Sequence, residues 1–132
     1  MDGTSRNADS YAAYRSVSGL GASPQEFMTM ALDSLRALLR RGENAIRAEE
    51  WVEKAEALNS AGKLVEFLIG LSGIEHGELS DRLASIYQFV LTSIFKANAR
   101  NDLDALADGR QAIEHVATIW HQIFAGVEER AA

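Results

Sequence analysis

The stretch Gly77–Asn98, GELSDRLASIYQFVLTSIFKAN, decides the fold. Its apolar residues recur at steps of three and four, which is typical of one face of a helix; they are Leu79, Leu83, Ile86, Tyr87, Val90, Leu91, Ile94 and Phe95. At about 100° per residue they cover roughly 180° of the helix surface, more than the ~100° that a core-facing stripe requires. Phe89 lies outside this arc, on the otherwise polar side. Such a helix either sits deep inside a bundle or presents an apolar groove to a partner.

Three further amphipathic helices are predicted around this stretch. The first starts at Ser23 as N-cap, with Pro24 and then Glu26 completing a capping box, and runs to about residue 47. The second covers about residues 50–71 and is apolar nearly all round over 64–71. The fourth follows an N-cap at Asp102 and runs to about residue 127. The predicted apolar stripes of these three helices are Met28, Leu32, Leu35, Leu39 and Ile46; Trp51, Ala55, Leu58, Ala61, Val65, Leu68 and Ile69; and Leu103, Leu106, Ile113, Val116, Ala117, Trp120, Ile123, Phe124 and Val127.

Long amphipathic helices with short connections predict an all-α fold, an antiparallel up-and-down four-helix bundle over residues 23–127. No linker divides the chain, so residues 1–132 are expected to form one domain. Residues 1–10 are polar, and we expect them to be mobile. Residues 11–18 place Tyr11, Tyr14 and Val17 at helical spacing, and we expect this short segment to pack on the bundle as a cover.

Composition excludes several classes of function. The chain of 132 residues has a formal net charge of −6, which argues against nucleic acid as a partner. It has no cysteine, so thiolate metal sites and cysteine nucleophiles are excluded. No apolar run is long enough for a membrane span or a signal peptide, so we expect a cytoplasmic protein without membrane insertion. The basic side chains Arg36, Arg40, Arg41 and Arg47 lie close together, as a solvated helix face or as a docking patch.

No catalytic, cofactor or metal site is expected from the residues. His115 and His121 are six residues apart, so they cannot share one helix face as metal ligands must, and His76 lies in a predicted loop. The segment Ser18–Gly21 lacks the lysine of a phosphate-binding loop. No nucleophile, base and orienting group can be named together, so the sequence predicts a protein that is not an enzyme.

Several motifs, in order, resemble the flagellar export chaperone family FliS. They span about Tyr11 to Ile123, and each is short, but their order and spacing together are specific. The motifs are Tyr11-x-x-Tyr14 followed by Val17; Ala22-Ser23-Pro24-Gln25-Glu26 and then Met30-Ala31-Leu32-Asp33; Ala61-x-x-Leu64-Val65-x-x-Leu68; Leu83-x-x-Ile86-Tyr87-Gln88-Phe89 with Leu91, Ala97, Asn98 and Asp102; and Trp120. Leu32 stands where the family usually has tyrosine, and Gln88 where it has an acidic residue.

The resemblance implies a cytoplasmic chaperone that binds the C-terminal segment of flagellin, prevents its premature polymerisation and delivers it to the flagellar type III export apparatus. The export gate, an anti-sigma factor and a co-chaperone are implied as further partners, with a monomer or weak dimer when free. The surplus apolar surface of the second and third helices fits such a client. The predicted partner-binding residues are Tyr11, Tyr14, Val17, Leu64, Phe67, Leu68, Leu71, Tyr87, Phe89, Leu91 and Phe95.

Within the opening stretch, Leu83, Ile86, Val90 and Ile94 are expected to face the core. Tyr87, Leu91 and Phe95 are expected at the edge of the arc, where a client would bind. The alternative function is a non-catalytic adaptor bundle that dimerises through the same surface or binds an anti-sigma factor or co-chaperone. A bundle that binds a small ligand or a metal is disfavoured by the histidine spacing above.

Overall fold

Four helices make up the computed structural model of the chain, which describes residues 23–72 and 77–131. They are α2 (Pro24–Ala48), α3 (Trp51–Ser72), α4 (Glu78–Arg100) and α5 (Leu103–Ala131). No strand occurs in these described residues. The predicted all-α four-helix bundle is confirmed, and the last helix continues to Ala131, beyond the predicted end near residue 127.

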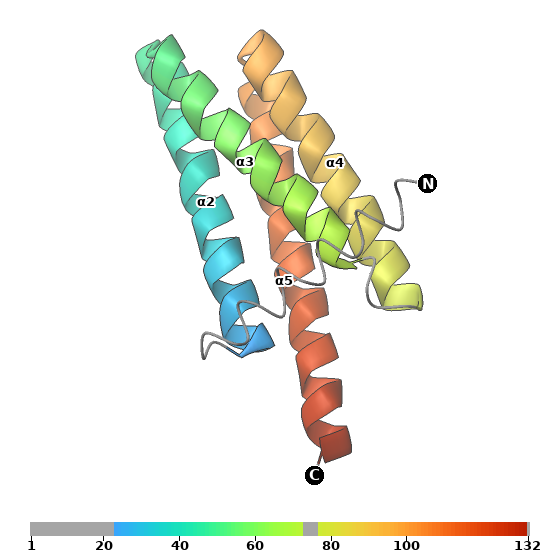
Figure 1. Cartoon of the computed structure of the whole chain (residues 1–132). Coiled ribbons are helices and arrows are strands. Elements are labelled where there is room, and N and C mark those ends of the chain that lie inside the picture. Colours follow the sequence, from blue (N-terminus) through green and yellow to red (C-terminus); the bar gives the residue numbers. More distant parts are fainter. Residues whose placement is uncertain (1–22, 73–76, 132) are drawn as a thin grey trace, which may run out of the picture.

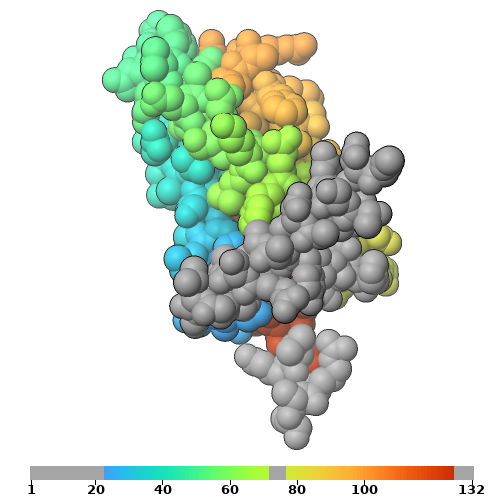
Figure 2. Space-filling model, in the orientation of Figure 1, coloured from blue at the N-terminus to red at the C-terminus, as the bar shows by residue number. Residues whose placement is uncertain are grey.

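The helices form a closed ring of antiparallel neighbours (Figure 1). α2 packs on α3, α3 on α4, α4 on α5, and α5 returns to α2, while the Cα atoms of diagonally opposite helices stay more than 8 Å apart. Figure 2 shows the surface of α3 between those of α2 and α4. The C-terminal part of α5 extends beyond the other three helices (Figure 1). The ring therefore has four seams, a seam being the line along which two neighbouring helices meet.

The helix ends follow from local hydrogen bonding. At the start of α2, the Ser23 hydroxyl accepts from the Glu26 N–H at 3.0 Å, and the Glu26 carboxylate accepts from the Ser23 N–H at 3.0 Å, so the predicted capping box is present. This pairing lowers the pKa of Glu26 through hydrogen bonds to the ionised carboxylate. Asp102 caps α5 as predicted, accepting from the Ala105 N–H at 3.0 Å. The turn between α2 and α3 is made by Glu49 at φ 57°, a left-handed conformation that glycine more commonly adopts.

The core is built from the predicted apolar stripes of the helices. The stripe of α2 is buried along its whole length, with Gly42 included. Leu83, Val90 and Ile94 of α4 are buried as expected, and Ile86 is half-buried against the core. The prediction for Trp51 was wrong: the ring is exposed at the first turn of α3, where the Lys54 ammonium lies 5.4 Å from the ring centroid.

Two buried glycines sit where helices approach closely. A Cβ on Gly42 would stand 2.4 Å from a Leu58 methyl carbon and 2.9 Å from Leu58 Cγ, so α2 and α3 can meet at this depth only without a side chain. A Cβ on Gly109 of α5 would stand 3.0 Å from the Ser93 Cβ on α4. Gly62 of α3 is buried too, but its Cβ position is 3.8 Å from the Leu91 Cδ1, an ordinary contact.

We expect Gly42→Ala and Gly62→Ala to have opposite effects on stability. Gly62→Ala should raise the free energy of unfolding by up to about 1 kcal/mol, because alanine is the better helix former and has room. Gly42→Ala should lower it by about 1–2 kcal/mol, because the fully buried Leu58 must move within a packed core and this strain exceeds the gain in helix propensity. Urea denaturation of the two variants measures both; equal stabilisation would show that α2 and α3 can separate at no cost.

Candidate partner-binding surface

Tyr87 lies in the core and not at an exposed edge of α4. Its side chain is 0% exposed, and its hydroxyl oxygen accepts a hydrogen bond of 2.9 Å from Trp120 Nε1 on α5. Burial raises the pKa of the Tyr87 hydroxyl to about 12, because the phenolate would lose its hydration, although the Trp120 hydrogen bond acts in the opposite direction. The expected position of Tyr87 at the edge of the arc is therefore wrong, and its aromatic ring fills the core.

Leu68 and Leu71 of α3 are also buried in the core cluster. Both were predicted to contact a partner, because the end of this helix is apolar nearly all round. α3 uses that breadth to pack against two neighbouring helices, α2 and α4. In this packed bundle neither side chain is available to a partner.

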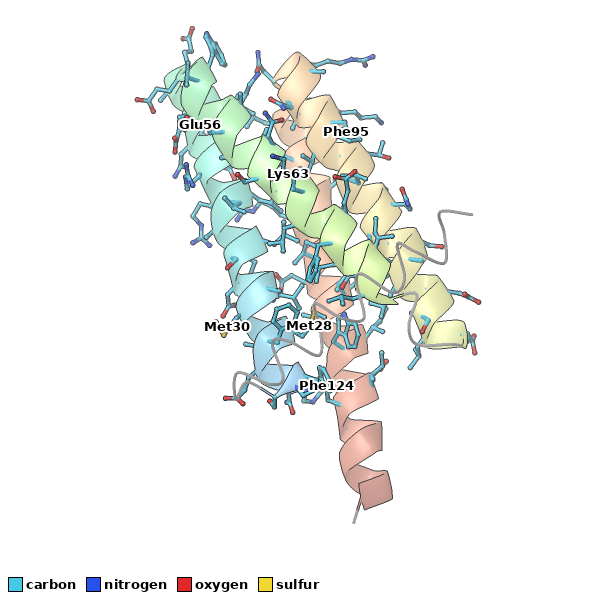
Figure 3. All side chains as sticks on the ribbon, viewed as in Figure 1. Met28, Met30, Glu56, Lys63, Phe95 and Phe124 are labelled. Carbon is cyan, nitrogen blue, oxygen red and sulfur yellow. The ribbon has the colours of Figure 1, made fainter. Side chains whose placement is uncertain are left out.

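On the α3/α4 seam, two of the predicted side chains remain accessible. Leu91 is half-buried against Gly62, and Phe95, one turn further along α4, is 58% exposed. Figure 3 shows Phe95 on α4 and Lys63 on α3, the two helices that form the α3/α4 seam.

A polar network closes one end of the α3/α4 seam. Lys54 Nζ donates to the Asn98 carbonyl at 2.8 Å and to Asn101 Oδ1 at 2.7 Å. Asn98 Nδ2 donates to Asn59 Oδ1 at 3.0 Å. Apolar surface on this seam is thus bounded at the end where α3 begins and α4 finishes.

Phe89 belongs to a different seam. It lies one turn before Ser93, whose side chain faces Gly109 of α5, so Phe89 borders the α4/α5 seam, where it is 50% exposed. Phe89 and Phe95 are six residues apart and therefore project about 120° from each other. The two exposed phenylalanines flank the outer face of α4 on opposite sides and do not form one patch.

Phe67 and Leu64 lie at a third place, on the side of α3 that faces α2. The Phe67 ring meets the Phe27 ring of α2 edge to face, with centroids 6.1 Å apart and planes at 78°. Leu64, one turn earlier, is half-buried against the core. Tyr11, Tyr14 and Val17 lie outside the described residues.

The described residues also bear on the expectations for metal sites and membrane spans. Among them, no group of three or more histidine, aspartate or glutamate side chains is placed to hold a metal ion. His115 and His121 are both exposed on α5. Within the same residues, no helix is long and apolar enough to cross a bilayer.

The structure thus belongs to the class of four-helix bundles, with accessible aromatic side chains on two of its seams. The model of the family described as "Flagellar protein FliS" matches residues 7–127 of the chain. The chain belongs to the FliS family.

Three curated relatives carry the name "Flagellar secretion chaperone FliS". The protein of Salmonella typhimurium (strain LT2) is 28% identical over 106 residues, which are 79% of this chain and 78% of the relative. The Escherichia coli (strain K12) protein is 24% identical over 105 residues, 78% of this chain and 77% of the relative. The Vibrio cholerae protein is 28% identical over 106 residues, 77% of this chain and 76% of the relative. The resemblance to the family in the sequence motifs is therefore confirmed.

Tyr87→Phe should lower the free energy of unfolding by about 1–3 kcal/mol at neutral pH, because it leaves the buried Trp120 N–H without an acceptor. The folded-state pKa of Tyr87, about 12, is above the unfolded value of 10.0. The wild-type protein is therefore expected to keep this stability below pH 10 and to lose about 2 kcal/mol as the pH rises to 12, a loss that the phenylalanine variant lacks.

Urea denaturation of both proteins at steps from pH 8 to about pH 12 measures the difference between them, which removes the contribution of the other titrating groups. The stability advantage of the wild type should shrink across this range. An advantage that stays constant with pH would mean that Tyr87 titrates normally in the folded state.

Proposed function

We propose that this protein is a cytoplasmic, non-catalytic export chaperone that binds the C-terminal segment of flagellin. In this function it keeps the client from polymerising prematurely and aids its delivery to the flagellar type III export apparatus. Membership of the FliS family over residues 7–127 is the observation that carries the proposal. The export gate, an anti-sigma factor and a co-chaperone are proposed as further partners.

The client contacts in this proposal are the accessible apolar side chains on the two seams of α4. Leu91 and Phe95 supply the α3/α4 seam, and Phe89 supplies the α4/α5 seam. Large exposed aromatic side chains are common anchors in protein interfaces, because burying them removes much apolar area from water. Since Phe89 and Phe95 project about 120° apart, the client has to wrap around α4 to reach both.

A client without fixed structure suits this arrangement. Burial of about 1,000 Å² of apolar surface contributes roughly 25 kcal/mol of favourable free energy, before the entropy lost on binding is subtracted. Ordering the client and losing its freedom to move offset most of that sum, which leaves an affinity on the order of sub-micromolar. A flexible segment can wrap around a helix, whereas a rigid partner would meet one seam only.

Phe95→Ala and Phe89→Ala should each weaken the binding of a fluorescent flagellin C-terminal peptide about tenfold, as expected from the loss of one apolar anchor. Their melting temperatures should stay within about 3 °C of wild type, since both rings are at least half exposed. Met30→Ala is the matched control, because Met30 is an apolar side chain that is 65% exposed on α2, the helix diagonally opposite α4 in the ring. Fluorescence anisotropy and thermal unfolding measure the two effects.

If Met30→Ala weakens peptide binding as much as Phe95→Ala does, the seams of α4 are not the client surface. The rival function, a bundle that dimerises through the same side chains, predicts a different result in size-exclusion chromatography. A chaperone gives a 1:1 complex with the peptide, whereas an adaptor dimer elutes at the same volume with and without it.

Residues 11–18 are proposed to cover part of the client surface until the client displaces them. Deletion of residues 1–18 should then raise the association rate of the peptide and the fluorescence of a dye that binds apolar surface. Stopped-flow anisotropy and dye titration measure these two quantities. If both quantities stay unchanged, residues 11–18 do not cover the client surface. The proposed client surface on α4 would still stand.

A further inference from the structure

A shallow hollow lies at the start of α3, beside the turn from α2. Two large apolar side chains stand next to each other in its wall: Trp51, which is 46% exposed, and Val52, which is 75% exposed. The hollow has a volume of about 540 Å³, and its other lining residues are Glu50, Glu53 and Glu56. Figure 3 shows Glu56 on α3 at this end of the bundle. We call these five residues the Trp51 surface.

The Trp51 ring is held in place by a lysine that is itself fixed. The Lys54 ammonium lies 5.4 Å from the ring centroid, where a cation attracts an aromatic face. The same ammonium donates to the Asn98 carbonyl at 2.8 Å and to Asn101 Oδ1 at 2.7 Å, both at the end of α4. A side chain that is already positioned loses little conformational freedom when a partner covers it. The exposed part of the ring is therefore preformed binding surface.

Negative charge on the Trp51 surface is only partly neutralised. Glu53 pairs with Arg41 of α2, whose Nη2 lies 2.9 Å from the Glu53 Oε2. Glu50 and Glu56 are exposed and have no ion pair in the described part of the chain, and the same holds for Glu49 in the adjoining turn. No lysine or arginine lines the hollow. With Arg41 and the lysine beside the ring counted, four carboxylates still stand against two cations.

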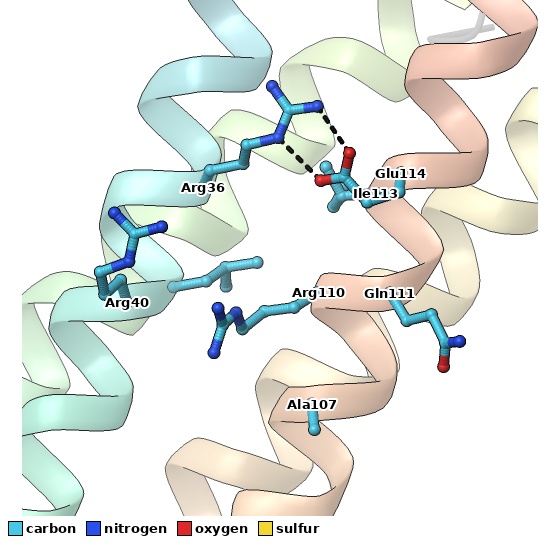
Figure 4. Close-up of a pocket in the computed structure, with 8 residues that line it drawn as sticks. Arg36, Arg40, Ala107, Arg110, Gln111, Ile113 and Glu114 are labelled. Atoms are coloured by element: carbon cyan, nitrogen blue, oxygen red, sulfur yellow. Dashed lines mark hydrogen bonds and ion pairs between the residues drawn. The ribbon is translucent and has the colours of Figure 1, made fainter.

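The carboxylates on the α2/α5 seam are used differently. Arg36 donates to Glu114 from Nε at 2.8 Å and from Nη2 at 3.0 Å, as Figure 4 shows, and it also donates to Asp33 at 2.9 Å. Arg110 of α5 pairs with Glu43 of α2. On that seam the carboxylates join two helices, whereas Glu50 and Glu56 join nothing in the described part of the chain.

Helix electrostatics explain only part of the acidic character of the Trp51 surface. Carboxylates at the first turn of a helix are stabilised by the positive end of the helix dipole, which accounts for Glu50 and Glu53. Glu56 lies in the second turn, where this effect has faded, and it stands three residues after Glu53, so that two like charges repel. Glu56 therefore gives α3 no electrostatic benefit, and a cation from a partner would relieve the repulsion.

We propose that the Trp51 surface docks a short basic segment of a protein partner, in which an arginine adjoins an apolar side chain. The apolar side chain covers Trp51 and Val52, and the guanidinium group binds the Glu56 carboxylate. Arginine suits this role because its planar fork matches a carboxylate and is less strongly hydrated than an ammonium group. The net charge of −6 attracts a basic segment at longer range as well.

The chemistry of the Trp51 surface disfavours other occupants. Nucleic acids and anionic lipids carry phosphates, which these carboxylates would repel. Within the described residues, no group of three or more histidine, aspartate or glutamate side chains is placed to hold a metal ion. A small organic cation would leave the two apolar side chains uncovered. The surface lies outside the proposed client surface, because the polar network around Lys54 closes the α3/α4 seam beside it, so the proposal does not rest on the proposed function.

The test uses the full chain and a short fluorescent peptide of arginines interrupted by leucines, with a glutamine-and-leucine counterpart as the neutral probe. Glu56→Gln should weaken binding of the basic peptide about two- to fivefold by anisotropy, the effect of one exposed ion pair, while the melting temperature does not fall. Glu66→Gln is the matched control, since Glu66 is an exposed carboxylate about 15 Å further along α3 with no ion pair among the described residues. At that distance it should change the affinity less than about 1.5-fold.

Two measurements test the apolar half of the surface. Trp51→Ala should weaken the basic peptide about tenfold, the effect of losing an aromatic anchor, whereas Met30→Ala, an exposed apolar side chain on α2, should not. In the wild type, acrylamide quenches an exposed indole and spares a buried one, so the signal reports Trp51 far more than Trp120, which is 6% exposed. Addition of the unlabelled basic peptide should reduce this quenching.

Four results would overturn the proposal. Equal losses in Glu56→Gln and Glu66→Gln would mean that only the overall charge matters. Displacement of the peptide by spermidine at equal concentration would make the hollow a general cation site. Quenching that stays the same when the peptide binds would place the peptide elsewhere. An equal loss of the flagellin C-terminal peptide in Trp51→Ala would assign the hollow to the client surface, whereas unchanged client binding in this variant separates the two surfaces.

Discussion

The backbone of each helix in the ring lies close to two neighbours and keeps its Cα atoms more than 8 Å from the helix across from it. That constraint limits how much of any one helix can be buried. The apolar arc of α4 is wider than its two contacts cover, so it ends in the accessible Phe95 toward α3, and Phe89, outside the arc, is accessible toward α5. The same closure brings α2 and α5 together, and with them the arginines that line their seam.

The Tyr87–Trp120 pair gives the core a directional contact among otherwise non-directional ones. Leucine and valine side chains can slide past one another at modest cost, but the single hydrogen bond between these rings is satisfied only when α4 and α5 stand in one register. Tyr87 belongs to the motif that carries the family resemblance, and here its ring and hydroxyl are occupied inside the bundle. Its place in the motif is thus explained by the packing of two helices.

The helices and their buried apolar stripes could be predicted from the sequence, because apolar residues spaced three and four apart mark the buried face of a helix directly. Three features could not. Glu49 ends α2 in a left-handed conformation without glycine, so composition did not mark that turn clearly. The width of the apolar arc on α4 did not say which neighbour covers each edge, and so Tyr87 was predicted at the edge of the arc. The pairing of Arg36 with Glu114 joins residues 78 positions apart, and nothing local in a single sequence reveals it.

The polar network of Lys54, Asn98 and Asn101 gives the α3/α4 seam a fixed end and therefore a length. From Asn98 back to the start of α4 at Glu78 the helix rises about 30 Å. A helical segment lying along this seam can be at most about 20 residues long, and an extended one about nine. In the proposed function, a client segment longer than this has to leave the seam and turn around the bundle.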